Sequence, residues 1–296
     1  MTKSNVLEAL NRLIEAKGSQ NIVAKALGVS STTISQYRSG KYPGDVAKLE
    51  GQIEQLSKKE QEKRERVKLA IPYVQTANAS AYFEVARACH IYEKLGVIYG
   101  PSGCGKTIAT YEYVKQNADV ILIEAAPDYT AKVLFSELHA KLGFSGNGSL
   151  HTMFIDCVNR LKQSGRLIII DEAEHLPHRA LELVRRLYDK AGVGILLVGM
   201  PRLMANLRGN KGEFAQLYSR VWFRVKLGSL TQEETEEIAS KTLSAMKNKG
   251  KIIFNLSNGN ARNAQKVLEC AVIIARSNEC EINESVLNET PKMTEL

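Results

Sequence analysis

Residues 100–107 read GPSGCGKT and carry the pattern GxxxxGK[ST]. In this pattern the glycines let backbone N–H groups turn toward phosphate oxygens, and a following helix adds the positive end of its dipole. A lysine at the position of Lys106 neutralises charge on the β- and γ-phosphates, and a hydroxyl at Thr107 is a ligand for Mg²⁺. The segment is therefore predicted to bind MgATP, through Gly100, Pro101, Ser102, Gly103, Cys104, Gly105, Lys106 and Thr107.

A second motif follows an apolar run at residues 167–170, which reads LIII and ends in Asp171 and Glu172. Four apolar residues predict a buried strand that delivers Asp171 to the metal and to the nucleotide. Glu172 is then placed to polarise an attacking water molecule as a general base. The two motifs together predict ATP hydrolysis to ADP and phosphate.

Short apolar runs of strand length surround these motifs, at residues 95–99, 120–124, 167–170, 194–198 and 221–227. Amphipathic helical stretches separate the runs, which favours a parallel sheet covered on both faces. The first run leads into residues 100–107, and a helix predicted at 108–116 leads out of them. Residues 231–290 are predicted to be purely helical.

The first part of the chain is predicted to be all-helical, with helices at 4–17, 20–27 and a third capped by Ser30 or Ser31. The segment 19–41 resembles a helix-turn-helix of the phage repressor type. Its second helix buries Ile34 and Tyr37, and short polar side chains with Gln and Arg suit base edges and phosphates in a major groove. The predicted DNA-binding residues are Ser31, Thr32, Thr33, Gln36 and Arg38. A plain three-helix interaction domain is the alternative.

The composition is that of a globular protein with a basic bias. The 296 residues include 40 Lys and Arg against 32 Asp and Glu, and residues 1–80 hold 13 against 8. The bias fits a polyanionic partner. Five cysteines show no CxxC pairing, which is typical of reduced thiols in a cytosol. Neither a signal peptide nor an apolar run long enough to span a membrane is present, so we expect a cytoplasmic protein in a bacterium or a phage-infected host.

Two further segments strengthen a resemblance to the AAA+ ATPases. Ser219-Arg220 precedes the last strand, where that family carries an arginine finger, and residues 259–262 (GNAR) resemble its sensor 2 segment. The resemblance implies a P-loop α/β fold with a parallel five-stranded sheet and a helical lid, preceded here by an all-α helix-turn-helix domain. It also implies that Arg220 and Arg262 are catalytic residues in addition to Glu172. Arg220 would act at the nucleotide site of a neighbouring subunit.

The expected domains follow from this resemblance and from the charged run KKEQEKRERVK at residues 58–68. They are a helix-turn-helix domain at 1–56, a charged linker at 57–83, a nucleotide-binding core at 84–228, and a helical lid with an acidic tail at 229–296.

The chain more closely resembles the transposon target-selection ATPases of the Mu B type. This resemblance rests on the N-terminal helices joined to an ATPase and on the segments IYGPSGCGKT, IIIDEAEHL and AQLYSRV. It implies a homo-oligomer, a helical filament or a ring, that assembles on double-stranded DNA with ATP, selects target DNA and activates a transposase. It also implies a second DNA surface on the core, for which the candidates are Lys132, Arg202, Arg208 and Lys211.

Met200 departs from the family pattern, because AAA+ proteins usually present a polar sensor 1 side chain at the end of the fourth strand. A thioether cannot orient water by a strong hydrogen bond, so we expect slow hydrolysis that depends on DNA or a partner.

Two other functions remain open from the sequence. A nucleotide-gated helix-turn-helix transcription regulator would read one short operator, whereas a target selector would coat arbitrary DNA. A secretion-type AAA+ ATPase would use its N-terminal helices to bind protein, and the missing membrane segment disfavours it.

Overall fold

The computed structural model describes residues 3–65, 71–208 and 215–294. The chain divides into two compact units, Met1–Leu69 and Ala70–Leu296. In the part of the chain that the structure describes, no helix is both long and apolar enough to cross a membrane.

The first unit is all-helical, as predicted. Its helices are α1 (Lys3–Lys17), α2 (Gln20–Leu27), α3 (Ser31–Arg38) and α4 (Val46–Glu65). The Ser19 and Ser30 side chains cap α2 and α3 by accepting from backbone amides, and Gly28 ends α2 with a left-handed φ of 70°. The helices enclose one core that includes Leu10, Val23, Ile34, Tyr37 and Ile53. Tyr37 also donates from its hydroxyl to Glu50 at 2.8 Å, which ties α3 to α4.

The boundary between the units differs from the predicted one. Helix α4 runs to Glu65 without a break, so residues 57–65 of the predicted linker are helical. At the other end, α5 (Ala77–Ile91) includes residues 77–83, and Thr76 caps it.

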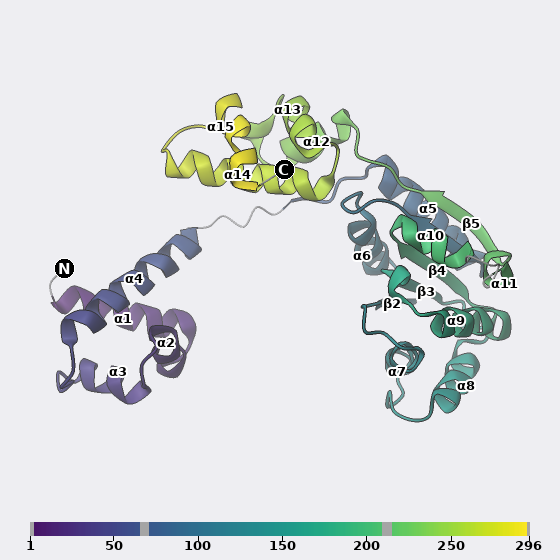
Figure 1. Cartoon of the computed structure of the whole chain (residues 1–296), viewed down its shortest axis with the longest axis horizontal. Coiled ribbons are helices and arrows are strands. Elements are labelled where there is room, and N and C mark those ends of the chain that lie inside the picture. The colour runs from purple at the N-terminus through teal and green to yellow at the C-terminus, as the bar shows by residue number, and fades with distance from the viewer. Residues whose placement is uncertain (1–2, 66–70, 209–214, 295–296) are drawn as a thin grey trace. The chain divides into compact units, whose positions relative to one another are not determined.

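The second unit contains the predicted parallel sheet (Figure 1). Its strands are β1 (Leu95–Tyr99), β2 (Val120–Glu124), β3 (Leu167–Asp171), β4 (Gly194–Gly199) and β5 (Val221–Lys226). Their order is β2-β3-β4-β1-β5, and every pair is parallel. The carboxyl ends of all five strands therefore meet at one edge of the sheet, where α/β proteins bind their ligands.

Helices cover both faces of the sheet. They are α6 (Lys106–Gln116), α7 (Ala131–Lys141), α8 (Leu150–Leu161), α9 (His178–Ala191), α10 (Pro201–Arg208) and α11 (Ala215–Tyr218), besides α5 and a short 3-10 helix η1 (Ala173–His175). Successive strand residues alternate between two cores: Val97 packs with α7 to α10, whereas Ile98 packs with α5 and α6. Burial on both faces explains why the strands are continuously apolar.

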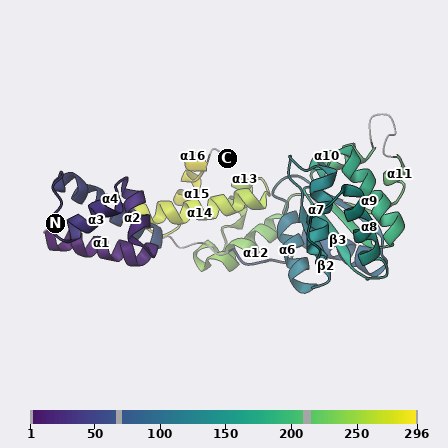
Figure 2. The ribbon, with the colours of Figure 1, turned by 90° about the horizontal axis from the view of Figure 1, so that it is seen from below.

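Helices after β5 form a lid, which Figures 1 and 2 show as one helical group. They are α12 (Gln232–Thr242), the 3-10 helix η2 (Ser244–Met246), α13 (Gly250–Ser257), α14 (Ala261–Ser277), α15 (Glu284–Glu289) and α16 (Pro291–Thr294). The lid begins with a capping box, in which Thr231 and Glu234 bond each other's backbone amides.

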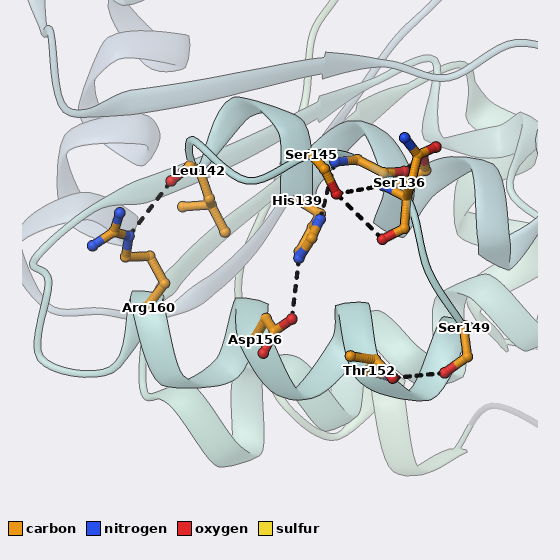
Figure 3. Close-up of polar contacts among 10 residues, drawn as sticks. Ser136, His139, Leu142, Ser145, Ser149, Thr152, Asp156 and Arg160 are labelled. Carbon is orange, nitrogen blue, oxygen red and sulfur yellow. Dashed lines mark hydrogen bonds and ion pairs between the residues drawn. The ribbon is translucent and has the colours of Figure 1, made fainter.

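A buried histidine fixes the glycine-rich connection between α7 and α8 (Figure 3). His139 is 4% exposed and accepts at Nδ1 from the Gly146 amide at 3.2 Å. Its Nε2 lies 3.2 Å from Asp156 on α8, and its ring stacks on Phe144. Because Nδ1 accepts, the ring proton is at Nε2 and is donated to Asp156. The His139 side chain thus links both helices to the loop between them.

Candidate nucleotide site

The phosphate-binding loop connects the end of β1 to the start of α6, as its sequence predicts. Gly103 and Gly105 have φ values of 75° and 92°, in the left-handed region that favours glycine. The Gly100 amide donates to the Gly199 carbonyl at 3.2 Å, which fixes the loop to the end of β4. Lys106 donates from Nζ to the carbonyls of Gly100 and Pro101, both at 2.8 Å. The ammonium group is therefore held on the loop, at the N-terminus of α6.

Asp171 lies at the carboxyl end of β3 and is 3% exposed. Its Oδ1 accepts from the Glu172 amide at 2.9 Å, and its carboxylate also accepts from the Thr107 hydroxyl. Burial raises the pKa of Asp171; the hydrogen bonds from Glu172 and Thr107 and the charge of Lys106 act in the opposite direction.

The Thr107–Asp171 pair fits Mg²⁺, which prefers oxygen ligands and is commonly held by one carboxylate, substrate phosphates and water. Among the described residues there is no group of three or more His, Cys, Asp and Glu side chains that could hold a metal by itself. A metal at Thr107 and Asp171 would therefore take most of its ligands from a nucleotide and from water.

Glu172 follows Asp171 directly and has a φ of 52°. A left-handed backbone at a residue other than glycine is strained, and such strain is concentrated at functional sites. The Glu172 side chain is 60% exposed, and its Oε2 lies 3.7 Å from Nε2 of His175. Glu172 is thus a solvent-accessible carboxylate next to a metal-ligand candidate, as a general base requires.

The lid contacts the phosphate-binding loop through the first residues of α14. Arg262 donates from Nη1 to the Ser102 hydroxyl at 3.0 Å. Asn260 donates from Nδ2 to the Ser102 carbonyl at 2.8 Å, and the Ala261 amide donates to the Gly103 carbonyl at 2.8 Å. The structure therefore places Arg262 beside Ser102 of the phosphate-binding loop, with Asn260 next to it.

Asn260 is a site residue that the sequence reasoning missed. Its Oδ1 caps α14 by accepting from the Arg262 and Asn263 amides, so one amide group serves both helix and loop. A Cβ atom at Gly103 would lie 2.0 Å from Asn260 Oδ1, which shows how closely the lid approaches. The signal available in the sequence was the asparagine at an N-cap position before a long amphipathic helix.

Asn78 is a second missed residue, near the start of α5. Its Nδ2 donates to the Cys104 carbonyl at 3.1 Å and to the Gly228 carbonyl at 2.9 Å, and its Oδ1 accepts from the Gly228 amide at 3.2 Å. Asn78 therefore joins the phosphate-binding loop to the connection between β5 and the lid. Nothing in the local sequence indicates this contact, because it joins residues 150 positions apart.

Arg220, the predicted arginine finger, lies away from this site within its own chain. It donates from Nε to Asp189 on α9 at 2.6 Å and from Nη1 to the Gln216 carbonyl at 2.8 Å. Asp189 also pairs with Arg185 at 2.5 Å. The structure thus does not bring Arg220 to the nucleotide site of the same chain.

The predicted DNA-binding residues lie on several helices. On α3, Thr32, Gln36 and Arg38 are exposed and Thr33 is partly exposed. Thr33 bonds Ser30, and Arg38 donates to Gln20 at 3.2 Å. In the core, Lys132 is exposed on α7, whereas Arg202 and Arg208 are exposed at the two ends of α10. Lys211 lies outside the described residues.

Comparison with known proteins identifies the family. Residues 90–207 match a family model described as an AAA domain. The chain is 31% identical over 249 residues to the Mu-like prophage FluMu DNA transposition protein B of Haemophilus influenzae. The matched region covers 81% of this chain and 84% of that protein. It is 30% identical over 250 residues to the ATP-dependent target DNA activator B of Escherichia phage Mu, covering 81% of this chain and 78% of that protein.

The fold also has solved counterparts. The ORC2 protein of Aeropyrum pernix, solved in ADPNP–ADP complexes, matches with a TM-score of 0.57 and 17% identity over 75% of this chain and 68% of that one. At 17% identity, this likeness concerns the fold alone. Because the matches to the two B proteins extend over most of each chain and the AAA domain match spans both nucleotide motifs, the chain belongs to the Mu B-like family of AAA+ ATPases.

Proposed function

We propose that the protein is an ATP-dependent, largely sequence-nonspecific DNA-binding ATPase that assembles on DNA, selects target DNA and activates a transposase. The observation that carries the proposal is the convergence of the phosphate-binding loop, Asp171, Glu172 and Arg262 in a relative of a protein named as an ATP-dependent target DNA activator. ATP hydrolysis and DNA binding are therefore proposed to be coupled in one chain.

In the proposed reaction, the loop amides and Lys106 bind the phosphates of ATP, and Arg262 reaches the terminal phosphate from the lid. Thr107 and Asp171 would hold Mg²⁺, which would neutralise charge on the phosphate oxygens. Glu172 accepts a proton from the water that attacks the γ-phosphorus, so ADP leaves with its bridging oxygen and phosphate forms.

Arg220 is proposed to act in a neighbouring copy. The guanidinium is charged at all physiological pH values and can bond two phosphate oxygens, which suits it to stabilise charge as the phosphoryl group transfers. Since Arg220 pairs with Asp189 within its own chain, assembly has to exchange this partner for the neighbour's nucleotide. Hydrolysis would then depend on assembly.

DNA is proposed to contact both units. The exposed residues of α3 suit a major groove, and an isolated module of this size reads few bases, so phosphate contacts supply most of the affinity. Lys132, Arg202, Arg208 and Lys211 are proposed to form the second surface, on the core.

Electron microscopy with arbitrary duplex DNA tests this proposal. Continuous protein-coated DNA is expected with ATP, and bare or sparsely bound DNA without it. Protection of one short sequence only, whether or not ATP is present, would instead identify an operator-reading regulator.

A further inference from the structure

A groove of about 490 Å³ lies between α8 and α9, which pack against each other (Figure 1). Its floor is apolar and consists of Leu150, Phe154 and Ile155 from α8 and Leu183 from α9. Leu150 and Leu183 are partly buried against the core of the second unit, whereas Ile155 is 37% exposed. The groove therefore presents a strip of apolar side chains to solvent.

The rim of the groove is basic. It carries side chains from both helices, namely His151, His178, Arg179, Arg186 and Lys190. Glu182 also lines the groove, but it accepts from Nε of Arg185 at 2.9 Å, and this hydrogen bond lowers the pKa of Glu182. In the part of the chain that the structure describes, Arg179, Arg186 and Lys190 are exposed and make no hydrogen bond or ion pair. Their positive charges are available to a ligand.

The spacing of these charges fits a helical ligand. Arg179, Arg186 and Lys190 recur on one face of α9, after two turns and after one further turn. They span roughly 16 Å along the axis at 1.5 Å per residue, which is the length of about three turns of a second helix. An amphipathic helix places apolar residues at every third or fourth position, and such a stripe binds in apolar grooves of this kind. Acidic residues beside the stripe would face the basic rim.

The apolar floor distinguishes a protein ligand from DNA. Duplex DNA would contact the rim through its phosphates, and these contacts leave Ile155 and Leu183 exposed to water. Apolar side chains of a protein would cover both residues and gain free energy from the buried area. Exposed apolar patches rimmed by polar residues are typical of protein interaction sites.

The acidic helices of this chain are already engaged within the second unit. On α12, Glu234 accepts from the Ala77 amide and Glu236 accepts from the Gly250 amide. Helix α15 buries its apolar residues in the lid. A second copy of the chain would have to break these contacts to fill the groove with either helix, so the observations favour a different protein.

We propose that the groove between α8 and α9 is a docking site for an acidic amphipathic helix of a partner protein. The apolar face of that helix packs on Ile155 and Leu183, and its carboxylates pair with Arg179, Arg186 and Lys190. No residue that lines the groove belongs to the nucleotide site. The inference is therefore independent of the proposed function, since it requires neither ATP hydrolysis nor DNA binding.

A synthetic peptide of about three to four turns is the probe for this site. It carries leucine at every third or fourth position, glutamate beside the leucines, blocked ends and a fluorescent label. Fluorescence anisotropy with the full-length protein, without nucleotide or DNA, should give a micromolar Kd. A peptide with lysine in place of every glutamate should bind at least about tenfold more weakly, because like charges then meet at the rim. This comparison requires no change in the protein.

Two variants locate the bound peptide. Arg186→Glu reverses a rim charge and Ile155→Ser removes an apolar contact, and each should weaken binding of the acidic peptide by about tenfold. Lys266→Glu is the matched control, because it makes the same change of charge at an exposed residue of α14 and should bind the peptide as wild type does. All three variants should keep the wild-type ATPase rate, which shows that they are folded.

The proposal is overturned if wild type does not bind the acidic peptide or binds both peptides equally. Binding that survives both Arg186→Glu and Ile155→Ser would also overturn it, because the peptide then occupies another surface. DNA affinity of the same variants tests the alternative ligand. If wild type fails to bind the peptide, and Arg186→Glu but not Lys266→Glu loses affinity for duplex DNA, the groove is a DNA surface instead.

Discussion

At the scale of single residues, the electrostatics of the site are dominated by the burial of Asp171. Burial raises its pKa above the value in the unfolded chain, because the charged form loses hydration. A carboxyl whose folded-state pKa is raised stabilises the fold only when protonated, so this contribution is present at low pH and is lost as pH rises through the folded-state value. At pH 7 the carboxylate therefore destabilises the nucleotide-free protein.

Asp171→Asn should consequently raise the Tm of the nucleotide-free protein by a few degrees at pH 7. The difference from wild type should shrink at acidic pH, because the raised pKa lets wild-type Asp171 become protonated at a higher pH than an exposed aspartic acid. The variant should also lose the Tm increase that MgATP gives wild type, because it lacks the charged metal ligand. Differential scanning fluorimetry at both pH values, with and without MgATP, measures these effects. A variant less stable than wild type at pH 7 would contradict the assigned cost of burial.

Lys106 and Glu172 are predicted to separate binding from chemistry. Lys106→Ala should abolish ATP binding, because the loop loses the charge that neutralises the phosphates. Glu172→Gln should bind ATP as wild type does and lose turnover by about 10²–10⁴-fold, the usual contribution of a general base. Equilibrium binding of a fluorescent ATP analogue and phosphate-release rates distinguish the two. Equal turnover by wild type and Glu172→Gln would remove Glu172 from the mechanism.

At the scale of elements, the lid meets the phosphate-binding loop through one helix start. Asn260→Ala should weaken ATP binding several-fold, because it removes the Ser102 contact and loosens Arg262. It should also cost about 1 kcal/mol of stability as a lost N-cap. Asn283→Ala is a matched control, since Asn283 caps α15 in the same lid by accepting from the Val286 amide at 3.0 Å. The Asn283→Ala control should lose similar stability and keep its ATP affinity. If both variants lose the same ATP affinity, the effect of Asn260→Ala comes from a less stable lid and not from the lost Ser102 contact.

The elements were predictable where one local pattern decides them. Apolar runs predicted the bounds of all five strands to within one or two residues. Because both faces of the sheet are buried, each strand is a continuous run of apolar residues. Residues 57–65 were assigned to a linker because they are strongly charged, although Lys, Glu, Arg and Gln also favour helices, and α4 continues through them. Contacts such as Asn78 with Gly228 and Arg220 with Asp189 could not be predicted, because they depend on how distant elements pack.

At the scale of the whole molecule, we expect the first compact unit to contribute to DNA binding and the second to bind ATP. The first has its own core, and its boundary at Leu69 shows that truncation has to remove all of α4. Deleting residues 1–69 should weaken DNA binding and flatten its dependence on salt, because fewer phosphate contacts release fewer counterions. ATP binding should remain, since the site lies in the second unit. DNA affinity over a salt series measures the effect, and an unchanged slope would assign the first unit to protein contacts.

The proposed assembly of several copies is also argued at the scale of the whole molecule. In a single chain, Arg220 is held by Asp189 and lies away from the nucleotide site, so the proposed catalytic role of Arg220 requires a second copy. Contacts of this head-to-tail kind generate rings or filaments, depending on whether the rotation between copies closes. Arg220→Ala should still bind ATP at its own Lys106 and show little DNA-stimulated hydrolysis. Arginine fingers in other phosphoryl-transfer systems contribute about 10³–10⁵-fold in rate, so the loss should be large.

Mixing two inactive variants tests whether Arg220 acts between chains. Lys106→Ala retains Arg220 but cannot bind ATP, whereas Arg220→Ala binds ATP but lacks the guanidinium. In a mixed assembly, some interfaces combine an intact nucleotide site from one copy with an intact Arg220 from its neighbour. DNA-stimulated phosphate release should therefore recover in the mixture and follow the product of the two fractions, with a maximum at equal amounts. The double variant Arg220→Ala/Lys106→Ala, mixed with either single variant, is the control, because it supplies neither missing group. If the mixture of single variants stays inactive while electron microscopy shows both on DNA, Arg220 does not complete its neighbour's site, and its pairing with Asp189 is structural.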